Sequence, residues 1–464
     1  MEDKTMKKVF GIAALLLALA ACNKVETEIT PVEQPSDSKG ITITATLAPK
    51  TADAKAVADG GDKITVTWAE NEKIAILYEV SGTRYASEAT IKTVDASGTA
   101  TIEFTVVSGT PDNTACTLVY PAKLSDGTTT VYNDEKTGVK DAATLLAAQD
   151  GTLNANLDVR VGAGTIRTTT PGLDVTTQPE AQFAIFKFTL SGPSIDATHP
   201  LVIKDNASNT TITTVTPAST ASSVYVAMPA AASKAYKFVV ITADNKYIKS
   251  GTATIEAGKY YQTTLTMSPR YPLALSSATA EWDLGAVACN DGYLYMEKKA
   301  VPSGKTAVGI LGKVTETGHG LILALQDAAW QTWDTINGWP SVTTFAGTTL
   351  KQLPEEALGS LKIYTFLMPT LSDPIPMSSW CVAQKRDYDE IFVNLGSTDV
   401  NSNGTTYDGN VNAYITTGVG GTAMTSNNYW SATEYDVNCA WNFGYGWYEL
   451  GKGINLNVRP VLGF

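Results

Sequence analysis

Histidine and charged residues are scarce in this sequence. Only two histidines occur among the 464 residues, His199 and His319, and they stand far apart. A histidine-based metal site or a Ser/His/Asp relay needs histidine beside other reactive groups, so both kinds of site are disfavoured. Asp, Glu, Lys and Arg make up 17% of the chain, against about 25% in typical soluble domains. We therefore expect no enzyme, no bound metal and no cofactor.

Positive charge is also in deficit. Lys and Arg number 34 against 46 Asp and Glu, a formal net charge of −12 that would repel phosphate backbones. Nucleic acid is thus an unfavourable partner. Thr, Ser, Asn and Gly replace the missing charge, and hydrophobic residues still make up 44%, which predicts β-rich, extracellular domains with real cores. At roughly 100–200 residues per domain, the chain should form two or three domains.

The first 40 residues predict export and anchoring. Lys7 and Lys8 precede an apolar run at 9–21, which is shorter than the roughly 20 residues of a membrane-spanning helix. Residues 1–21 therefore predict a signal peptide. The run ends in Leu-Ala-Ala-Cys22, which resembles the lipobox of bacterial lipoproteins and implies cleavage before an acylated Cys22. The alternative is a small buried cysteine. Residues 22–40 are polar and predict a flexible tether on an outer-membrane lipoprotein.

Alternating residues then predict two antiparallel β-sandwiches, at 41–175 and 176–268. A helix-like run interrupts the first at 141–149. The expected strands lie at 41–47, 63–68, 73–78, 99–106 and 116–121, and then at 182–190, 200–204, 222–230, 236–243 and 259–267.

Composition changes after a predicted linker at 269–280. Of nine tryptophans, only Trp68 precedes residue 281. Residues 281–464 mix strands with helices, which predicts a third domain of the α+β class. The expected strands lie at 307–314, 321–325 and 457–464, and the expected helices at 327–335 and 384–395.

The first 270 residues resemble a fimbrillin, the subunit of the type V pili of anaerobic Gram-negative bacteria. The resemblance rests on the lipobox and on the strings KITVTWAENEKIAILYEV, LVYPA and AGKYYQTTLTM. It implies that a trypsin-like protease cuts behind the first strand and that a strand from another subunit fills the groove. Such a groove exposes backbone groups that only a matching strand satisfies.

Here the first strand would be 41–47, with Lys50 and Lys55 as the candidate cut sites. The family usually offers arginine, whereas the first arginine of this chain is Arg84. The alternative is that both lysines are solvated loop residues and that the tether stays intact.

Residues 281–464 resemble a C-type-lectin-like module, on strings that include SSWCVAQKRDYDEIF and the segment from 429 to 464. The resemblance implies binding of a carbohydrate or a host protein. Calcium-dependent lectins carry Glu-Pro-Asn or Gln-Pro-Asp, which this chain lacks, and Trp441-Asn442 is followed by Phe443. We therefore expect no calcium at the sugar position.

Aromatic and short polar residues near the end of the chain suit stacking on a sugar face. The alternative is that Trp430 and Trp441 belong to the core, while flanking glycines favour exposure of Tyr445, Trp447 and Tyr448. The candidate ligand-binding residues are Asp436, Asn438, Trp441, Asn442, Tyr445, Trp447 and Tyr448.

Four cysteines remain after Cys22. Export permits disulfides, and the hypothesis is a bridge between Cys381 and Cys439. The alternative is that Cys116, Cys289 and the other two are small apolar residues of the cores.

The sequence thus predicts a cell-surface lipoprotein that acts as an adhesive tip or minor subunit of a type V pilus. Because 457–464 belongs to the third domain, the chain would accept a donor strand and have nothing obvious to donate. The main alternative is a lipid-anchored glycan- or protein-binding protein of the outer membrane that does not polymerise. An enzyme is a weaker alternative, which replacement of Glu434 or Asp436 would test.

Overall fold

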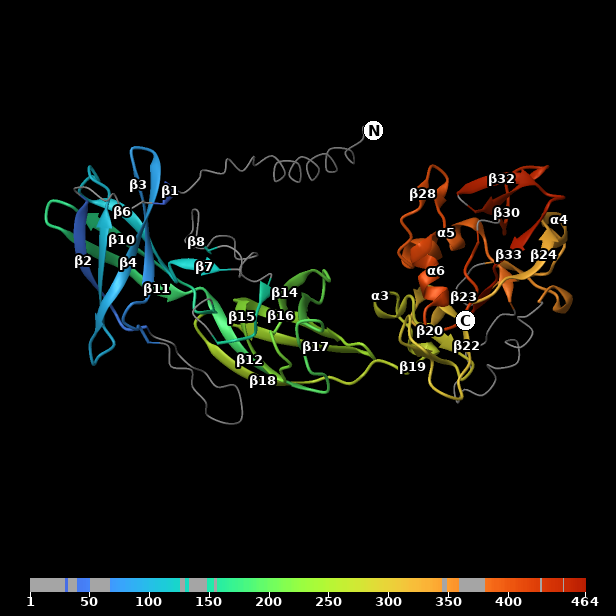
Figure 1. Ribbon diagram of the computed structural model, residues 1–464, viewed down its shortest axis with the longest axis horizontal. Helices are drawn as coiled ribbons and strands as arrows, with labels where there is room; N and C mark the ends of the chain where they lie inside the picture. Colours follow the sequence, from blue (N-terminus) through green and yellow to red (C-terminus); the bar gives the residue numbers. More distant parts are fainter. Residues whose placement is uncertain are drawn as a thin grey trace, which may run out of the picture. The chain divides into compact units, whose positions relative to one another are not determined.

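The fold is mainly β, as predicted. A computed structural model describes residues 30–31, 40–50, 67–125, 130–132, 148–153, 157–343, 349–358, 380–425, 428–444 and 446–464. The chain forms two compact units (Figure 1). The first contains residues 1–238 and 249–266, and the second contains 239–248 and 267–464.

The first unit opens with one large sheet (Figure 1). β2 lies at one end of it and pairs antiparallel with β5, from Ile41 opposite Val106 to Leu47 opposite Ala100. A short strand, β1 (Thr30–Pro31), pairs in parallel with β4. In order, the sheet contains β11 (Gly172–Ala181), β10 (Arg160–Arg167), β6 (Thr114–Tyr120), β3 (Lys73–Val80), β4 (Thr83–Val94), β5 (Ala100–Val106) and β2 (Ile41–Leu47).

Alternation explains why β2 is a strand. Ile43, Ala45 and Leu47 are buried while the threonines between them are exposed. Successive side chains of a strand point to opposite faces, so the apolar set packs into the core around Phe104. The predicted strand 41–47 is confirmed to the residue. Of the predicted strand 63–68, residues 63–66 lie outside the described residues, and Trp68 lies outside any strand.

Two smaller sheets follow, and most of their residues lie in the first unit. Phe188 of β12 meets Phe238 of β16 edge to face, with 5.3 Å between ring centroids, so the two sheets pack on each other. One contains β15 (Ser223–Pro229), β12 (Phe183–Ser191) and β18 (Tyr260–Thr266), and the other contains β17 (Lys246–Ile255), β16 (Ala231–Ile241), β13 (Leu201–Asp205), β14 (Thr211–Val215) and β9 (Ala148–Gln149). A separate ladder joins β7 (Lys123–Ser125) to β8 (Thr130–Tyr132).

Two predictions in this region are corrected. The boundary placed between 175 and 176 falls inside β11, which pairs with β10. The helix-like run 141–149 ends in β9, whose Gln149 side chain donates to Thr213 Oγ1 and to the Ala227 carbonyl, both at 3.0 Å. Residues 141–147 lie outside the described residues. The chain therefore reaches the smaller sheets at β9 and returns to the large sheet for β10 and β11.

The second unit is built on two sheets with short helices. The larger sheet contains β19 (Leu273–Ala274), β21 (Tyr293–Tyr295), β20 (Val287–Cys289), β22 (Ala307–Glu316), β23 (His319–Ala324), β34 (Val461–Gly463), β27 (Cys381–Val382), β26 (Thr349–Gln352) and β25 (Ser341–Thr343). The smaller contains β24 (Ala328–Thr332), β33 (Asn455–Val458), β30 (Tyr429–Glu434), β31 (Cys439–Phe443) and β32 (Trp447–Gly451). The remaining elements are η2 (Leu275–Ser277), α3 (Ala280–Asp283), α4 (Trp333–Asn337), η3 (Glu355–Ala357), α5 (Lys385–Asn394), β28 (Val400–Asn401), β29 (Gly404–Thr405) and α6 (Gly409–Thr416).

The predicted linker at 269–280 is wrong, because these residues are part of the second unit. Tyr271, Leu275 and Ala278 are buried in its core. The Arg270 guanidinium donates to both oxygens of the buried Asp283 carboxylate, at 2.6 and 2.5 Å. This bidentate ion pair holds the backbone at Arg270 close to that at Asp283. The lectin-like segment predicted from 281 therefore lies in a unit that also contains 239–248 and 267–280.

One of the two helix predictions is confirmed, and the other is partly wrong. The helix expected at 384–395 is confirmed as α5, whose Tyr388, Ile391 and Phe392 are buried at helical spacing. The helix expected at 327–335 is wrong in its first half, where β24 pairs with β33, and α4 begins only at Trp333. No helix in the described ranges has the length and apolarity to cross a membrane.

The segment predicted as one strand at 457–464 forms parts of two. β33 belongs to the smaller sheet, whereas β34 lies between β23 and β27 in the larger one. Between them stands Arg459, fully buried, with Nε 2.8 Å from Asp327 Oδ1. Residues 461–463 therefore pair with β23 on one side, and Val461 also pairs with Cys381 of β27 on the other.

Candidate functional site

The first candidate site surrounds the edge strand β2. In the described part of the chain, β2 has a backbone ladder with β5 alone. Beyond its end, the Ala48 amide donates to the Gln178 side chain of β11 at 3.1 Å. A strand held by one ladder is the strand that costs least to exchange for another.

The segment after β2 ends in a buried lysine. The Lys50 side chain is only 1% exposed, and its Nζ lies 3.4 Å from Glu72 Oε2 and 3.3 Å from Asp158 Oδ2. Nζ also lies 4.3 Å from the ring centroid of Trp68 and 3.6 Å from that of Tyr120. We call Trp68, Glu72, Tyr120 and Asp158 the Lys50 cage. Two carboxylates and two aromatic faces are the groups that stabilise a buried ammonium.

Neighbouring hydrogen bonds hold the cage in shape. Tyr120 donates its hydroxyl to Glu72 Oε1 at 2.5 Å, and Arg160 Nε donates to both oxygens of Asp158, at 2.9 and 3.1 Å. The Trp68 indole N–H donates to the Ala48 carbonyl at 2.9 Å. The cage thus grips the chain by the Lys50 side chain and by the backbone just before it.

Burial and neighbouring charges shift the pKa of Lys50 in opposite directions. Burial lowers the pKa of Lys50, while the negative charges of Asp158 and Glu72 raise it, and burial has the larger effect. Burial likewise raises the pKa of Tyr120, which keeps its hydroxyl as the donor to Glu72.

These contacts correct one predicted cut site. A trypsin-like protease must draw the basic side chain into its own pocket, and in the folded chain that of Lys50 is in the cage. Cleavage after Lys50 is therefore disfavoured. Lys55 lies outside the described residues, as does Cys22.

A cavity adjoins the cage. Its volume is about 710 Å³, and it lies where the end of β2 meets residues 178–181 and the turn at 257–259. Lys50, Trp68 and Arg160 are among its lining residues. The cage therefore borders this cavity on one side.

The second candidate site is on the smaller sheet of the second unit. Trp441 of β31 is partly exposed, and Tyr435 meets it edge to face with 5.1 Å between centroids. Lys385 Nζ lies 5.1 Å from the Trp441 ring centroid and 4.6 Å from that of Trp447. We call Lys385, Tyr435 and Trp441 the aromatic surface. A ring beside a cation suits a ligand with an apolar face and polar groups.

The start of α5 positions Lys385 beside Trp441. Lys385 is the first residue of α5, and its backbone N–H donates to Thr433 Oγ1 of β30 at 2.8 Å. Farther along α5, the buried Asp387 carboxylate accepts from Lys313 Nζ of β22 at 3.0 Å. The helix is thereby tied to both sheets. Burial lowers the pKa of Lys385, while Asp389 raises it.

Strand alternation separates the predicted ligand-binding residues. Trp441 stands opposite Glu449, whereas Asn442 stands opposite Tyr448. Cross-strand partners share a face and their neighbours take the other, so Trp441 and Tyr448 lie on opposite faces. Asn442 is fully buried and donates to the Tyr448 carbonyl at 2.8 Å. Asn442 is thus not available to a ligand. Tyr448 is exposed, but on the face of the sheet opposite to that of Trp441.

The expected exposure of Trp447 is wrong. Trp447 is buried, and its indole N–H donates to the Thr405 carbonyl at 2.8 Å. Trp430 is also buried, as the core alternative required. A Cβ on Gly446 would lie 2.5 Å from Asn401 Nδ2, so this glycine permits a close approach rather than an exposed loop.

The loop before Trp441 is a self-contained turn. Asp436 Oδ1 accepts from the backbone N–H groups of Asn438 and Cys439, both at 2.7 Å. Both Asp436 and Asn438 are exposed, but the first is engaged in shaping its own turn. Tyr445 lies outside the described residues.

Sequence reasoning missed Lys385, and it missed the cage. No local pattern connects Lys385 to Trp441, because the contact depends on the docking of α5. For the cage, the one available signal was Trp68 standing four residues before Glu72 in a sequence stretch with no other tryptophan.

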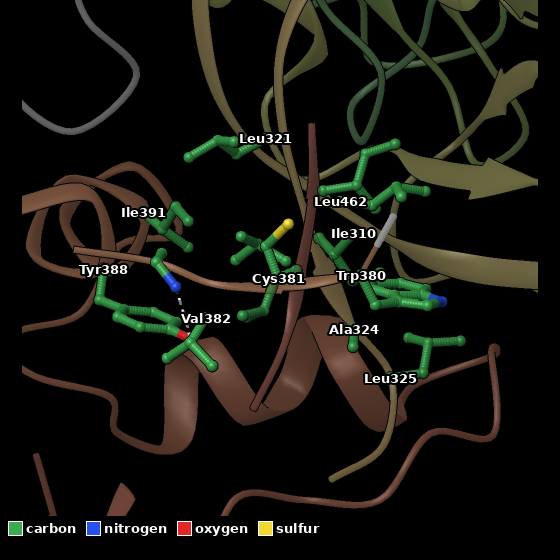
Figure 2. Packing of buried hydrophobic residues seen from close by; sticks show 14 of the residues in the cluster. Ile310, Leu321, Ala324, Leu325, Trp380, Cys381, Val382, Tyr388, Ile391 and Leu462 are labelled. Carbon is green, nitrogen blue, oxygen red and sulfur yellow. Dashed lines mark hydrogen bonds between the residues drawn. The ribbon is translucent and has the colours of Figure 1, made fainter. Parts of the chain in front are cut away.

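The predicted disulfide is not formed. Cys381 and Cys439 are thiols in the structure, as are Cys116 and Cys289. Figure 2 shows the Cys381 sulfur among apolar side chains of the larger sheet, including Ile310, Leu321 and Leu462. The alternative of small core cysteines therefore fits Cys116, Cys289 and Cys381, which are buried, while Cys439 is half-buried.

We expect thiol reagents to distinguish these cysteines. Burial raises the pKa of Cys116 and of Cys289 to about 12, so both stay protonated and unreactive at pH 8. Native protein should label at Cys439 and lose that labelling on Cys439→Ser, and denatured protein should label at Cys381 without added reductant. A Cys381 that labels only after reduction would contradict the assignment. Peptide mass spectrometry reads each site.

No group of three or more His, Cys, Asp or Glu side chains that could hold a metal ion occurs in the ranges that the structure covers.

Comparisons with known proteins give weak similarity. No protein-family model and no curated protein matches the chain. A fimbrial protein from Bacteroides ovatus is similar at 13% identity and TM-score 0.24, over 92% of this chain and 99% of its own.

Two further solved structures are similar over part of the chain. A candidate cell adhesion protein from Bacteroides fragilis shows 12% identity and TM-score 0.26, over 49% of this chain and 92% of its own. The minor pilin GBS52 from Streptococcus agalactiae shows 11% identity and TM-score 0.21, over 49% and 96%. Similarity at this level carries no argument about the fold or function of this chain.

Proposed function

We propose that the chain is a cell-surface adhesion subunit of the fimbrillin type that accepts a strand from another subunit in place of β2. The observation that carries the proposal is the position of β2, an edge strand with three inward apolar side chains whose ladder, among the described residues, is with β5. Its loss would uncover the inward face of β5, where Ile102 and Phe104 are buried. A strand of matching alternation would restore both the apolar contacts and the hydrogen bonds.

Processing in this proposal occurs behind the cage. Because the side chain of Lys50 is buried, Lys55 is the better cut site, and cleavage there releases β2 together with Lys50. Before cleavage, an acylated Cys22 anchors the chain to the outer membrane.

Recognition in this proposal belongs to the second unit. It acts as a lectin-like domain whose aromatic surface binds a carbohydrate or a host protein. Residues 461–463 lie inside a sheet and are poorly placed to serve as a donor strand. The position proposed for the chain is that of a tip or minor subunit, and no enzyme activity is proposed.

A second function keeps the chain at the membrane. The Lys50 cage holds the end of β2 with two ion pairs and two aromatic contacts. This favours a lipoprotein that retains β2, never polymerises and binds its ligand from the outer membrane.

Both functions place recognition at the aromatic surface. On an array of defined oligosaccharides, we expect Trp441→Ala to weaken binding about two- to tenfold, since stacking on an aromatic ring contributes about 0.5–1.5 kcal/mol. The matched control is Tyr448→Ala, which removes an exposed ring on the opposite face. Equal losses for the two variants, or binding unaffected by either, would remove the aromatic surface from the proposal.

A further inference from the structure

The Lys50 cage has the form of a binding pocket for one cation. Trp68 precedes β3, Glu72 lies just before it, Tyr120 ends β6, and Asp158 precedes β10. All four come from outside β2, so the pocket belongs to the body of the domain and the ammonium belongs to the exchangeable segment. A basic side chain from another strand can therefore replace Lys50 while these four residues stay in place.

Departure of Lys50 would leave the pocket with an unbalanced charge. Apart from Lys50, the cation that contacts these carboxylates within the described residues is Arg160, which pairs with Asp158 at 2.9 Å, and the Asp158 side chain is only 10% exposed. Buried carboxylates without a counter-ion are strongly unfavourable. The faces of Trp68 and Tyr120 add attraction for a cation and none for an anion.

The pocket also has a fixed place in the strand register. Leu47 is the last buried residue of β2, and Lys50 follows it by three positions. A new strand that pairs with β5 as β2 does would bring its own residue at that position to the pocket. The cavity beside the cage offers room for that residue to enter.

We propose that the Lys50 cage is a specificity pocket for strand exchange, which selects a donor strand with a lysine three residues beyond its last inward apolar side chain. This inference rests on the proposed function, and it adds the chemistry of the partner. The donor is an extended segment of another subunit with alternating apolar residues, followed by a basic residue. A donor with a neutral residue there would leave the half-buried Glu72 carboxylate and the largely buried Asp158 carboxylate without the ammonium that now pairs with both.

Peptide competition on the full chain tests the pocket. A recognition sequence for a site-specific protease is inserted between Asp59 and Gly60, and the chain is cut there, so that β2 is held without a covalent link. Fluorescent, C-terminally amidated peptides of residues 40–53 are then added in mild denaturant, and binding is followed by anisotropy. The peptides carry the natural sequence, Lys50→Met, or Thr44→Met as the control at an exposed position.

We expect the natural peptide to bind at least tenfold more tightly than Lys50→Met, and Thr44→Met to bind within about twofold of the natural one, since it touches neither core nor pocket. In a cut chain that carries Glu72→Gln, the advantage of the lysine should shrink. Equal binding of the natural and Lys50→Met peptides would overturn the specificity pocket and leave strand exchange standing. If no peptide binds although β2 dissociates, strand exchange itself is overturned.

Discussion

Replacing Lys50 with methionine should raise the rate of amide hydrogen exchange in residues 40–50 about a hundredfold. Methionine keeps most of the volume of the lysine stem but removes the charge that balances Glu72 and Asp158. Removing one partner of a buried ion pair costs about 3–5 kcal/mol. We take the lower end, because the Glu72 side chain is 25% exposed and water can partly solvate it. About 3 kcal/mol corresponds to a factor of about a hundred.

The matched control is a lysine on the same sheet in an exposed ion pair. Lys92 Nζ lies 3.1 Å from Glu103 Oε1, with side chains 49% and 45% exposed. Exposed pairs contribute about 0–1 kcal/mol, so Lys92→Met should change exchange in residues 40–50 by less than about fivefold. Comparable effects of the two substitutions would show that the cage does not hold the end of β2.

Ile43→Asp should prevent stable folding of the first sheet. Ile43 is fully buried in the core beside Phe104. The substitution removes an apolar side chain from the core and buries a carboxylate among apolar side chains. We expect this to lower the free energy of unfolding by at least about 4 kcal/mol. The measurement is the soluble yield of the full chain together with hydrogen exchange in β5.

Thr42→Asp is the control, one residue earlier on the same strand. Thr42 is exposed and stands opposite Thr105, an uncharged residue, so its substitution should change stability by no more than about 0.5 kcal/mol. If Ile43→Asp and Thr42→Asp behaved alike, β2 would not contribute its inward face to the core. The proposed exchange by matching apolar residues would then lose its basis.

Alternation of apolar and polar residues predicted β2 to the residue, and it failed on β10. The inward positions of β10 include Gly162 and Gly164. A Cβ on Gly162 would lie 2.7 Å from the Thr177 carbonyl oxygen, so the close approach of β11 requires glycine. Glycine carries no hydrophobic signal, and the sequence therefore predicted no strand at 160–167. The misplaced domain boundary follows from that omission.

Side-chain partners from distant segments could not be predicted. The linker prediction at 269–280 failed because Arg270 finds a buried partner in Asp283, which composition does not reveal. The candidate residues around Trp441 were chosen by their nearness in sequence, yet a strand divides neighbours between two faces. Trp441 and Asn442 thus differ in exposure although they are adjacent.

Mass spectrometry of the N-terminus of this protein, purified from surface fibres, tests the account most directly. If β2 is released to admit a strand from another subunit, the fibre-bound chain begins beyond residue 50, at Ala56 for cleavage after Lys55. An acylated Cys22 on the fibre-bound chain would contradict strand exchange, because β2 would then still be attached and in place.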